Sequence, residues 1–209
     1  FKYQGRKKET EMTEKEKRDQ GVLYDANYDL RLKAERDRAK ELCFALNQLP
    51  PSRVGEKDRL LRELLGAAGE QFEIVTPFWC DYGYHITLGE RFFSNHNLVI
   101  LDCAAVTFGT DVFVGPNCGF YTAGHPVDFS RRDQGLGYAW PITVGSHVWF
   151  GGGVQVMPGV TIGSNVVIGS GSVVTRDIPD GCVAAGNPCR VIRPITEQDE
   201  ARVYHWDKI

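Results

Sequence analysis

The sequence of 209 residues predicts a mainly β fold, a parallel solenoid of short stacked coils that follows a small α-helical cap. The main observation is a six-residue periodicity of aliphatic side chains that runs unbroken from Ile142 to Val174. This period does not fit the helical repeat of about 3.6 residues and is a multiple of the strand repeat of two, so each step should be one short strand and a turn. The second observation is that residues 13–65 lack this period and place their leucines at helical spacing.

The repeat keeps one register over six consecutive steps, and an ordinary sandwich of irregular strands would not do so. The six steps are Val144-Gly145, Phe150-Gly151, Val156-Met157, Ile162-Gly163, Ile168-Gly169 and Val174-Thr175. Two positions earlier stand Ile142, Val148, Val154, Val160, Val166 and, as the exception, Ser172. The same register holds at Val106 and Phe108, Val112 and Val114, and Cys118 and Phe120, and a less regular run begins at Leu88.

The aliphatic side chains of the repeat are expected to point towards a common axis, and three steps should close one triangular coil. Glycine should occupy the corners, where a Cβ would hinder the turn or a positive φ is needed. Coils must stack to bury their edges, which explains why the repeats form a continuous array.

Residues 12–70 are expected to form the helical cap. Thr13 and Glu16 fit a capping box that begins a short helix. Asp29 is a candidate N-cap for a second helix that ends near Leu49, before the sequence PPS. The apolar stripe of this helix comprises Leu42, Ala45, Leu46 and Leu49. A third helix is expected over residues 56–65, with Gly66 as its left-handed C-cap.

The remaining boundaries follow from the same patterns. Residues 71–193 are expected to form the β-helix, with residues 121–141 as one long inserted loop and residues 194–209 as a C-terminal tail. Residues 1–11 have no periodicity and precede Met12, so they are interpreted as a loose tail or a vector-derived remnant and left out of the fold argument.

Composition restricts the class of protein. The net charge is -3 and the basic residues are dispersed, which disfavours binding to nucleic acid. No apolar segment approaches the roughly 18 residues that cross a bilayer, and the N-terminal region is too charged for a secretory signal. The six cysteines form no CxxC pair, so reduced and mostly buried thiols are expected. Together these features predict a cytoplasmic protein that does not bind membranes.

The one large interruption of the repeat lies between Phe120 and Ile142, after which the register resumes in phase. Loops on a rigid scaffold often carry catalytic residues, and this loop contains His125 in the sequence YTAGHPVDFS. An imidazole can accept a proton near neutral pH, and the flanking Gly124 and Pro126 restrict the backbone that aims it. The competing interpretation is a surface histidine without a task, and the position of His125 at the break argues against it.

Several motifs together resemble the maltose and galactoside O-acetyltransferases, which are hexapeptide-repeat acyltransferases. They are TAGHPVD, PFWCDYGYHITLGERFFSNHN, ILDCAAVTFG, ITVGSHVWFGGGVQVMPGVTIG, VIGSGSVVTRDIP and AAGNPCRVIR. The segment GVLYDANYDLRLKAERDRAKELC is similar to the helical cap of that family. The resemblance covers residues 12–193 and implies that the parallel β-helix is left-handed.

The resemblance implies a set of residues for each substrate. His125 would be the general base, and Asp25, Asp81, Phe93, Asn95 and Asp102 would contact the acceptor. Cys103 stands where the family motif often has a second carboxylate, which puts that acceptor contact in doubt. Residues that match the coenzyme A channel are Trp149, Gly152, Ser170, Thr175, Arg176, Arg190 and Arg193. Backbone N–H groups at glycine corners, Gly152 above all, suit an oxyanion, and arginines suit the nucleotide phosphates.

These residues predict an acetyl-CoA-dependent O-acetyltransferase, a homotrimer that acetylates a neutral sugar of the glucose, maltose or galactoside type. The transfer should be direct, because no serine or cysteine stands beside His125 in the motif and Cys118 is expected in the core. Three alternatives remain open. The first is another acceptor such as serine or an amino sugar, and the second is a non-catalytic binding protein. The third is a metal-dependent hydratase, which is disfavoured because the histidines lack the close pair that such zinc sites use. The five histidines are His85, His96, His125, His147 and His205, and no metal is expected.

Overall fold

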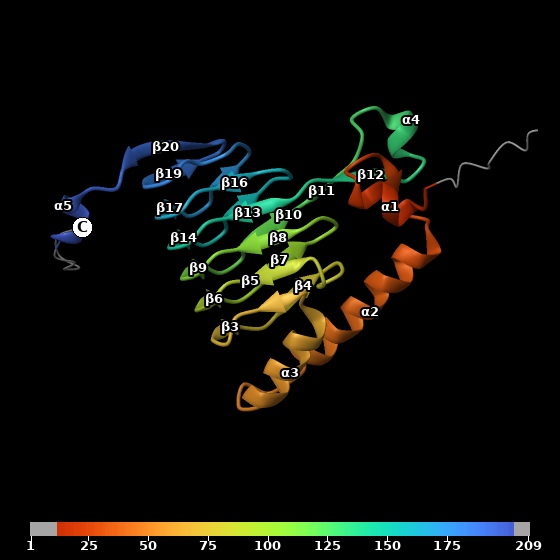
Figure 1. The fold of residues 1–209 in the computed structure, drawn as a ribbon, viewed down its shortest axis with the longest axis horizontal. Coiled ribbons are helices and arrows are strands. Elements are labelled where there is room, and N and C mark those ends of the chain that lie inside the picture. Colours follow the sequence, from red (N-terminus) through yellow and green to blue (C-terminus); the bar gives the residue numbers. More distant parts are fainter. Residues whose placement is uncertain (1–11, 203–209) are drawn as a thin grey trace, which may run out of the picture.

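The computed structural model describes residues 12–202, which form a three-sided stack of β-coils with helices along one flank (Figure 1). The predicted N-terminal tail of residues 1–11 lies outside the described residues, as does His205. No helix in the described part of the chain has the length and apolar character that crossing a membrane requires.

Three sheets form the sides of the stack, and their neighbouring strands are parallel except for the last pair of the third sheet, which is antiparallel. The first has the order β16 (Thr161–Ile162), β13 (Ile142–Val144), β8 (Val106–Phe108), β5 (Ile86–Leu88) and β2 (Ala67–Ala68). The second has the order β18 (Val173–Val174), β15 (Gln155–Val156), β10 (Gly119–Tyr121), β7 (Leu98–Leu101) and β4 (Phe78–Cys80). The third has the order β20 (Cys189–Pro194), β19 (Cys182–Gly186), β17 (Val166–Ile168), β14 (Val148–Phe150), β9 (Val112–Val114), β6 (Phe92–Ser94) and β3 (Phe72–Ile74).

The register of these sheets confirms the six-residue repeat. Val144 pairs with Ile162, which is 162 − 144 = 18 positions later, so three steps of six make one coil. Every inward-pointing position of the repeat is buried, including Ser172, whose hydroxyl donates to the carbonyl of Gly169 at 2.5 Å. Phe108 pairs with Val144 across the insertion, so the register does resume in phase.

Crowding, rather than a positive φ, requires glycine directly after the apolar residue. A Cβ at Gly145 would lie 2.7 Å from the carbonyl carbon of Gly163 in the next coil. The left-handed position falls two residues later, where His147 has a φ of 58° and Asn165 a φ of 54°. Two requirements on the backbone therefore fall on different residues of the repeat. The close approach of the next coil requires glycine, whereas the residue with positive φ can also be asparagine, aspartate or histidine.

Five helices complete the described residues: α1 (Glu14–Asp19), α2 (Leu30–Asn47), α3 (Val54–Leu64), α4 (Phe129–Arg132) and α5 (Glu197–Glu200). The predicted capping box of Thr13 and Glu16 is confirmed, and so is the N-cap Asp29, whose carboxylate accepts from the N–H of Leu32 at 2.8 Å. Asn47 at the end of α2 exchanges two hydrogen bonds of 2.9 Å with the backbone of Phe78, so it protects the edge strand β4.

Two details of the predicted cap are wrong. Ala45 is exposed, and Ala39 and Cys43 share the buried face of α2 with Leu46. Gly66 is not a left-handed cap, because α3 ends at an extended Leu65. Glycine is required at position 66 for another reason, since a Cβ there would lie within 3 Å of the carbonyl oxygen of Tyr84.

A fourth, antiparallel sheet joins the cap to the insertion and was not predicted. Strand β12 (Leu136–Ala139) lies between β11 (Ala123–Gly124) and β1 (Tyr24–Asp25), with Gly124 opposite Tyr138 and Tyr24 opposite Gly137. In Figure 1 this hairpin and α4 project beside α1, away from the stacked coils. The insertion is therefore anchored by a strand far earlier in the chain, since Tyr24 and Gly137 are 137 − 24 = 113 positions apart.

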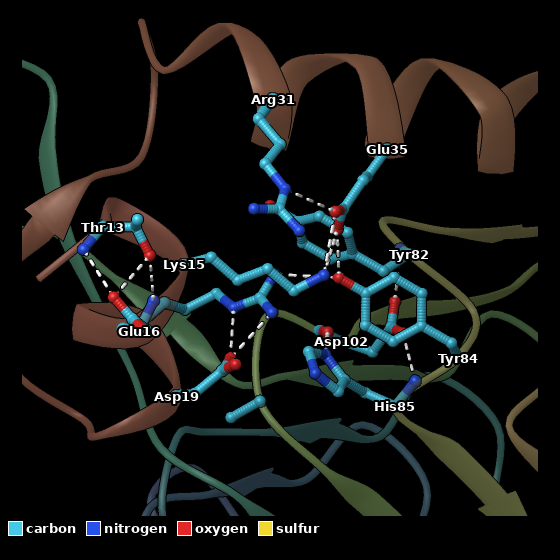
Figure 2. A network of polar contacts seen from close by, with 12 residues as sticks. Thr13, Lys15, Glu16, Asp19, Arg31, Glu35, Tyr82, Tyr84, His85 and Asp102 are labelled. Carbon is cyan, nitrogen blue, oxygen red and sulfur yellow. Dashed lines mark hydrogen bonds and ion pairs between the residues drawn. The ribbon is translucent and has the colours of Figure 1, made fainter.

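The cap is also attached to the β-helix by a polar network that includes the buried Arg18. Figure 2 shows Asp19, Glu35 and Tyr84 of this network. The guanidinium of Arg18 donates to Asp19 at 2.7 Å and to the hydroxyl of Tyr84 at 3.2 Å, and it lies 4.7 Å above the Tyr82 ring. Tyr84 in turn donates to Glu35 at 2.5 Å, so the segment after β4 contacts both α1 and α2. The buried charge of Arg18 is thereby satisfied by a carboxylate and a hydroxyl.

Candidate active site

His125 directly follows β11 and lines a pocket between the insertion and the cap. The antiparallel hairpin places the ring next to Gly137, where an added Cβ would lie 3.7 Å from Cε1 of His125. The side chain is exposed, while the following Pro126 is buried. The backbone around the histidine is thus held by the fourth sheet and the imidazole itself is accessible.

The hydrogen bond of the imidazole defines its tautomer. Nδ1 lies 2.9 Å from the carbonyl oxygen of Leu136. A carbonyl oxygen can only accept, so Nδ1 carries the proton and Nε2 keeps its lone pair. A histidine held in this way can take a proton at Nε2 from a group that enters the pocket.

The pocket has a volume of ≈ 280 Å³ and combines carboxylate, amide and cationic groups. Asp81, Asn27, Arg36 and Lys40 supply its polar side chains. Tyr24, Ala26, Leu101, Cys103, Ala123, Gly124 and His125 complete the lining. Arg36 is fixed by a hydrogen bond of 2.8 Å to the hydroxyl of Tyr82. This mixture of donors and acceptors suits a compact ligand that bears several hydroxyl groups.

Cys103 is part of the pocket wall and remains a thiol. Burial raises its pKa to about 12, and the nearby carboxylate of Asp81 acts in the same direction. The S–H group donates to Oδ2 of Asp81 at 3.5 Å. A protonated thiol is a poor nucleophile, and in this arrangement Cys103 acts as a hydrogen-bond donor to Asp81.

Of the five residues expected to contact the acceptor, the structure brings only Asp81 into the pocket with His125. Asp102 is fully buried, and its carboxylate accepts from the backbone instead. The carboxylate of Asp25 accepts from the N–H of Tyr28 at 2.8 Å, which closes the turn before α2. Phe93 and Asn95 lie on another side of the molecule.

A second groove, of ≈ 560 Å³, runs along the outer face of the third sheet. It contains three of the residues predicted for the coenzyme A channel, Trp149, Gly152 and Ser170, together with Phe93 and Asn95. Phe93, Phe113 and Trp149 stand in one cross-strand column. Phe113 and Trp149 are 52% and 56% exposed, so the groove offers an apolar strip beside a glycine-rich corner.

The other predicted donor residues lie outside this groove. Thr175 and Arg176 are exposed after β18, and Arg190 on β20 donates to the carbonyl of Cys189 at 2.7 Å. Arg193 forms two hydrogen bonds with Asp199, at 2.7 and 2.6 Å, and lines a separate pocket near α5. The structure therefore divides the predicted donor set between the groove and the C-terminal end of the stack.

Sequence analysis missed four polar residues that line the pocket: Tyr24, Asn27, Arg36 and Lys40. Arg36 and Lys40 are one helical turn apart on α2, and this spacing was the one available clue. Within residues 12–202, no group of three or more His, Cys, Asp and Glu side chains could hold a metal ion.

Comparison with known proteins identifies relatives of this chain. Residues 17–69 match the maltose acetyltransferase hexapeptide capping motif, and residues 141–176 match the six-repeat bacterial transferase hexapeptide family. The Saccharomyces cerevisiae protein YJL218W, which bears a provisional acetyltransferase name, is 56% identical over 86% of this chain and 91% of its own length. Galactoside O-acetyltransferase of Escherichia coli K12 is 44% identical, over 81% of this chain and 83% of its own.

Solved structures support the same assignment. A galactoside acetyltransferase in complex with coenzyme A superposes with a TM-score of 0.90 and 40% identity, covering 94% of this chain and 98% of that one. A maltose O-acetyltransferase from Clostridium difficile 630 gives a TM-score of 0.86 and 46% identity, covering 88% and 98%.

The stacked six-residue coils therefore define a hexapeptide-repeat transferase. More specifically, the chain belongs to the maltose and galactoside O-acetyltransferase family, and it is an acetyltransferase that uses acetyl-CoA.

Proposed function

We propose that this protein transfers the acetyl group of acetyl-CoA directly to a hydroxyl of a neutral sugar, with His125 as the general base. The observation that carries the proposal is the Nδ1–H hydrogen bond of His125 to Leu136, which leaves Nε2 as a base in a polar pocket. The relatives named for galactoside and maltose acetylation support a sugar as the acceptor.

The proposed reaction needs no covalent intermediate. Nε2 of His125 takes the proton from the acceptor hydroxyl while its oxygen attacks the thioester carbonyl. The tetrahedral oxyanion is stabilised by backbone N–H groups, with that of Gly152 as the proposed donor. Coenzyme A then leaves as a thiolate, and the protonated imidazole returns the proton to it. The high pKa of Cys103 and the buried position of Cys118 both support direct transfer.

We propose a homotrimer because one chain divides the required groups between two places. His125 and Asp81 line the pocket beside the cap, whereas Gly152, Trp149 and Asn95 line the groove on the third sheet. Direct transfer requires the thioester and the hydroxyl to meet, so the groove of one subunit should face the pocket of another. Light scattering should give three times the chain mass of 23.4 kDa, and a monomer at assay concentration would refute the trimer.

The most specific part of the proposal is that the acceptor sugar carries no charge. Asp81, Asn27 and Tyr24 can exchange hydrogen bonds with several hydroxyl groups at once. Arg36 and Lys40 introduce positive charge, which makes a sugar acid or sugar phosphate the competing acceptor.

The six cysteines are all free and buried, which supports a reducing compartment such as the cytosol.

An acceptor panel tests the activity and the substrate class together. Glucose, maltose, galactosides, an amino sugar, serine and a sugar phosphate are each incubated with acetyl-CoA, and thiol release is measured. We expect the highest kcat/KM for a neutral sugar. The highest value for an amine or a phosphorylated sugar would refute the acceptor class, and tight acetyl-CoA binding without turnover on any of these acceptors would refute the neutral-sugar assignment.

A further inference from the structure

The short turn after β4, residues 81–85, is tied at four points to the buried Asp102. Its Oδ1 accepts from the N–H groups of Asp81 at 3.0 Å and Tyr82 at 2.8 Å, and its Oδ2 accepts from the N–H of His85 at 3.4 Å. The carbonyl oxygen of Asp102 also accepts from Nδ1 of His85 at 2.6 Å. Figure 2 shows this carboxylate beneath the turn, between Tyr82 and His85.

The turn carries Asp81, the residue that brings a carboxylate into the pocket of His125. The side chain of Asp81 is held in addition by the thiol of Cys103, the residue that follows Asp102. Two consecutive residues directly after β7 therefore fix one residue of the proposed acceptor pocket. Asp102 fixes its backbone, and Cys103 fixes its carboxylate.

Burying the carboxylate of Asp102 should destabilise the folded state unless its oxygens are hydrogen-bonded. Its side chain is fully buried, and within residues 12–202 no cation lies at ion-pair distance from it. A buried carboxylate without a cation destabilises a folded protein unless hydrogen bonds compensate, and here the compensation comes from the N–H groups of the turn. The stability of the carboxylate and the geometry of the turn therefore depend on each other.

We propose that Asp102 is a positioning residue that sets the acceptor affinity of the active site by holding Asp81, without touching the acceptor itself. This inference rests on the proposed function, because it assigns Asp81 to acceptor binding. It replaces the expectation that Asp102 contacts the acceptor. The donor groove lies on the third sheet and does not include the turn, so acetyl-CoA binding should be independent of Asp102.

A double-mutant cycle tests whether Asp102 acts through Asp81. In Asp102→Asn an NH₂ group replaces one accepting oxygen and faces the N–H donors of the turn, so the turn should shift. We expect the acceptor KM to rise about 10- to 100-fold, since a misplacement near 1 Å can have an effect of this size, while the acetyl-CoA KM stays within about twofold. In an Asp81→Ala background the same substitution should change the acceptor KM by less than about twofold.

Ser172→Ala is the matched control, because Ser172 is also fully buried and bonded to backbone groups but lies far from the turn in sequence and contacts Gly169 and Gly186. Its acceptor KM should be unchanged. The proposal is overturned if Asp102→Asn has equal effects in both backgrounds, or if it raises both KM values together.

Amide hydrogen exchange separates this inference from the proposed function, because it needs no acceptor. Asp102→Asn should accelerate exchange at the amides of Asp81 and Tyr82 relative to the wild type, whereas Ser172→Ala should leave them protected. Unchanged exchange in Asp102→Asn would overturn the anchoring role. If the wild type acetylates no sugar, the proposed function fails, and faster exchange would still establish that Asp102 holds the turn.

Discussion

The stacked coils and the inserted hairpin are stabilised in different ways. In the coils, Phe92, Phe108, Phe120 and Phe150 are buried along the axis, with neighbouring ring centroids 4.9 to 5.2 Å apart. In the insertion, Val127 and Phe129 are 95% and 70% exposed, and the order comes from backbone pairing with β12 and β1. The molecule therefore places its proposed base on its less packed part and anchors that part by strand pairing to the cap.

This contrast teaches that stability and chemistry are assigned to separate residues. The axis needs only apolar volume, which any coil supplies by the same six-residue rule. The pocket needs groups from α2, the segment after β4 and the insertion at once. Substitutions in the two regions should accordingly change different measured quantities.

The largest expected effect is on catalysis, from His125→Ala. Turnover should fall by ~10²- to 10⁴-fold because assistance by a general base contributes that much to the chemical step. The affinity for coenzyme A and the unfolding midpoint should change little, since the side chain is exposed and makes one hydrogen bond, to Leu136. Initial rates measure the turnover, and calorimetric titration measures the affinity for coenzyme A. A loss of coenzyme A affinity as large as the loss of turnover would indicate a structural role for His125.

The next effect is on stability and compares one phenylalanine from each region. Phe120→Ala should lower the free energy of unfolding by about 3–5 kcal/mol, because it opens a cavity between Phe108 and Phe150. Phe129→Ala, on the exposed side of α4, should change it by less than about 0.5 kcal/mol. Chemical denaturation at fixed protein concentration checks both, and similar losses would mean that the insertion is packed as tightly as the coils.

The same contrast explains how much could be predicted from the sequence. The coils were predicted because each step repeats a local rule, and Ile142, Val148 and Val154 are buried as the period required. The N-caps Thr13 and Asp29 were predicted because capping depends on residues three positions apart. Local rules of this kind need no knowledge of the partner segment.

The proposed acceptor pocket was predicted only in part, because the residues that line it are distant in the chain. Nothing in the local sequence of Tyr24 indicates that it pairs with Gly137, or that Arg36 shares a pocket with His125. Asp102 was assigned to the acceptor from its motif, but its orientation depends on three backbone donors of the 81–85 turn. The motif therefore placed Asp102 beside the pocket, while the hydrogen bonds of its carboxylate could be seen only in the structure.

The smallest expected effect concerns the pH dependence of stability that the buried Asp102 should cause. Burial raises the pKa of Asp102 to about 6, although the N–H of Tyr82 favours its charged form. In the unfolded chain an aspartate has a pKa of about 3.9. The folded state therefore binds the proton more tightly, so Asp102 contributes stability below pH 4 that is lost as the pH rises to about 6.

The difference between the two pKa values corresponds to at most about 3 kcal/mol, because one pKa unit is worth about 1.4 kcal/mol. Asp102→Asn has no group that titrates at this position. The unfolding free energy of the wild type minus that of Asp102→Asn should consequently fall between pH 4 and pH 7 by up to this amount, measured by denaturant titration at each pH. A difference that stayed constant or rose with pH would contradict this prediction. It would mean that the hydrogen bonds from the N–H groups of the turn stabilise the charged carboxylate more than burial destabilises it, so that the pKa of Asp102 is not raised in the folded state.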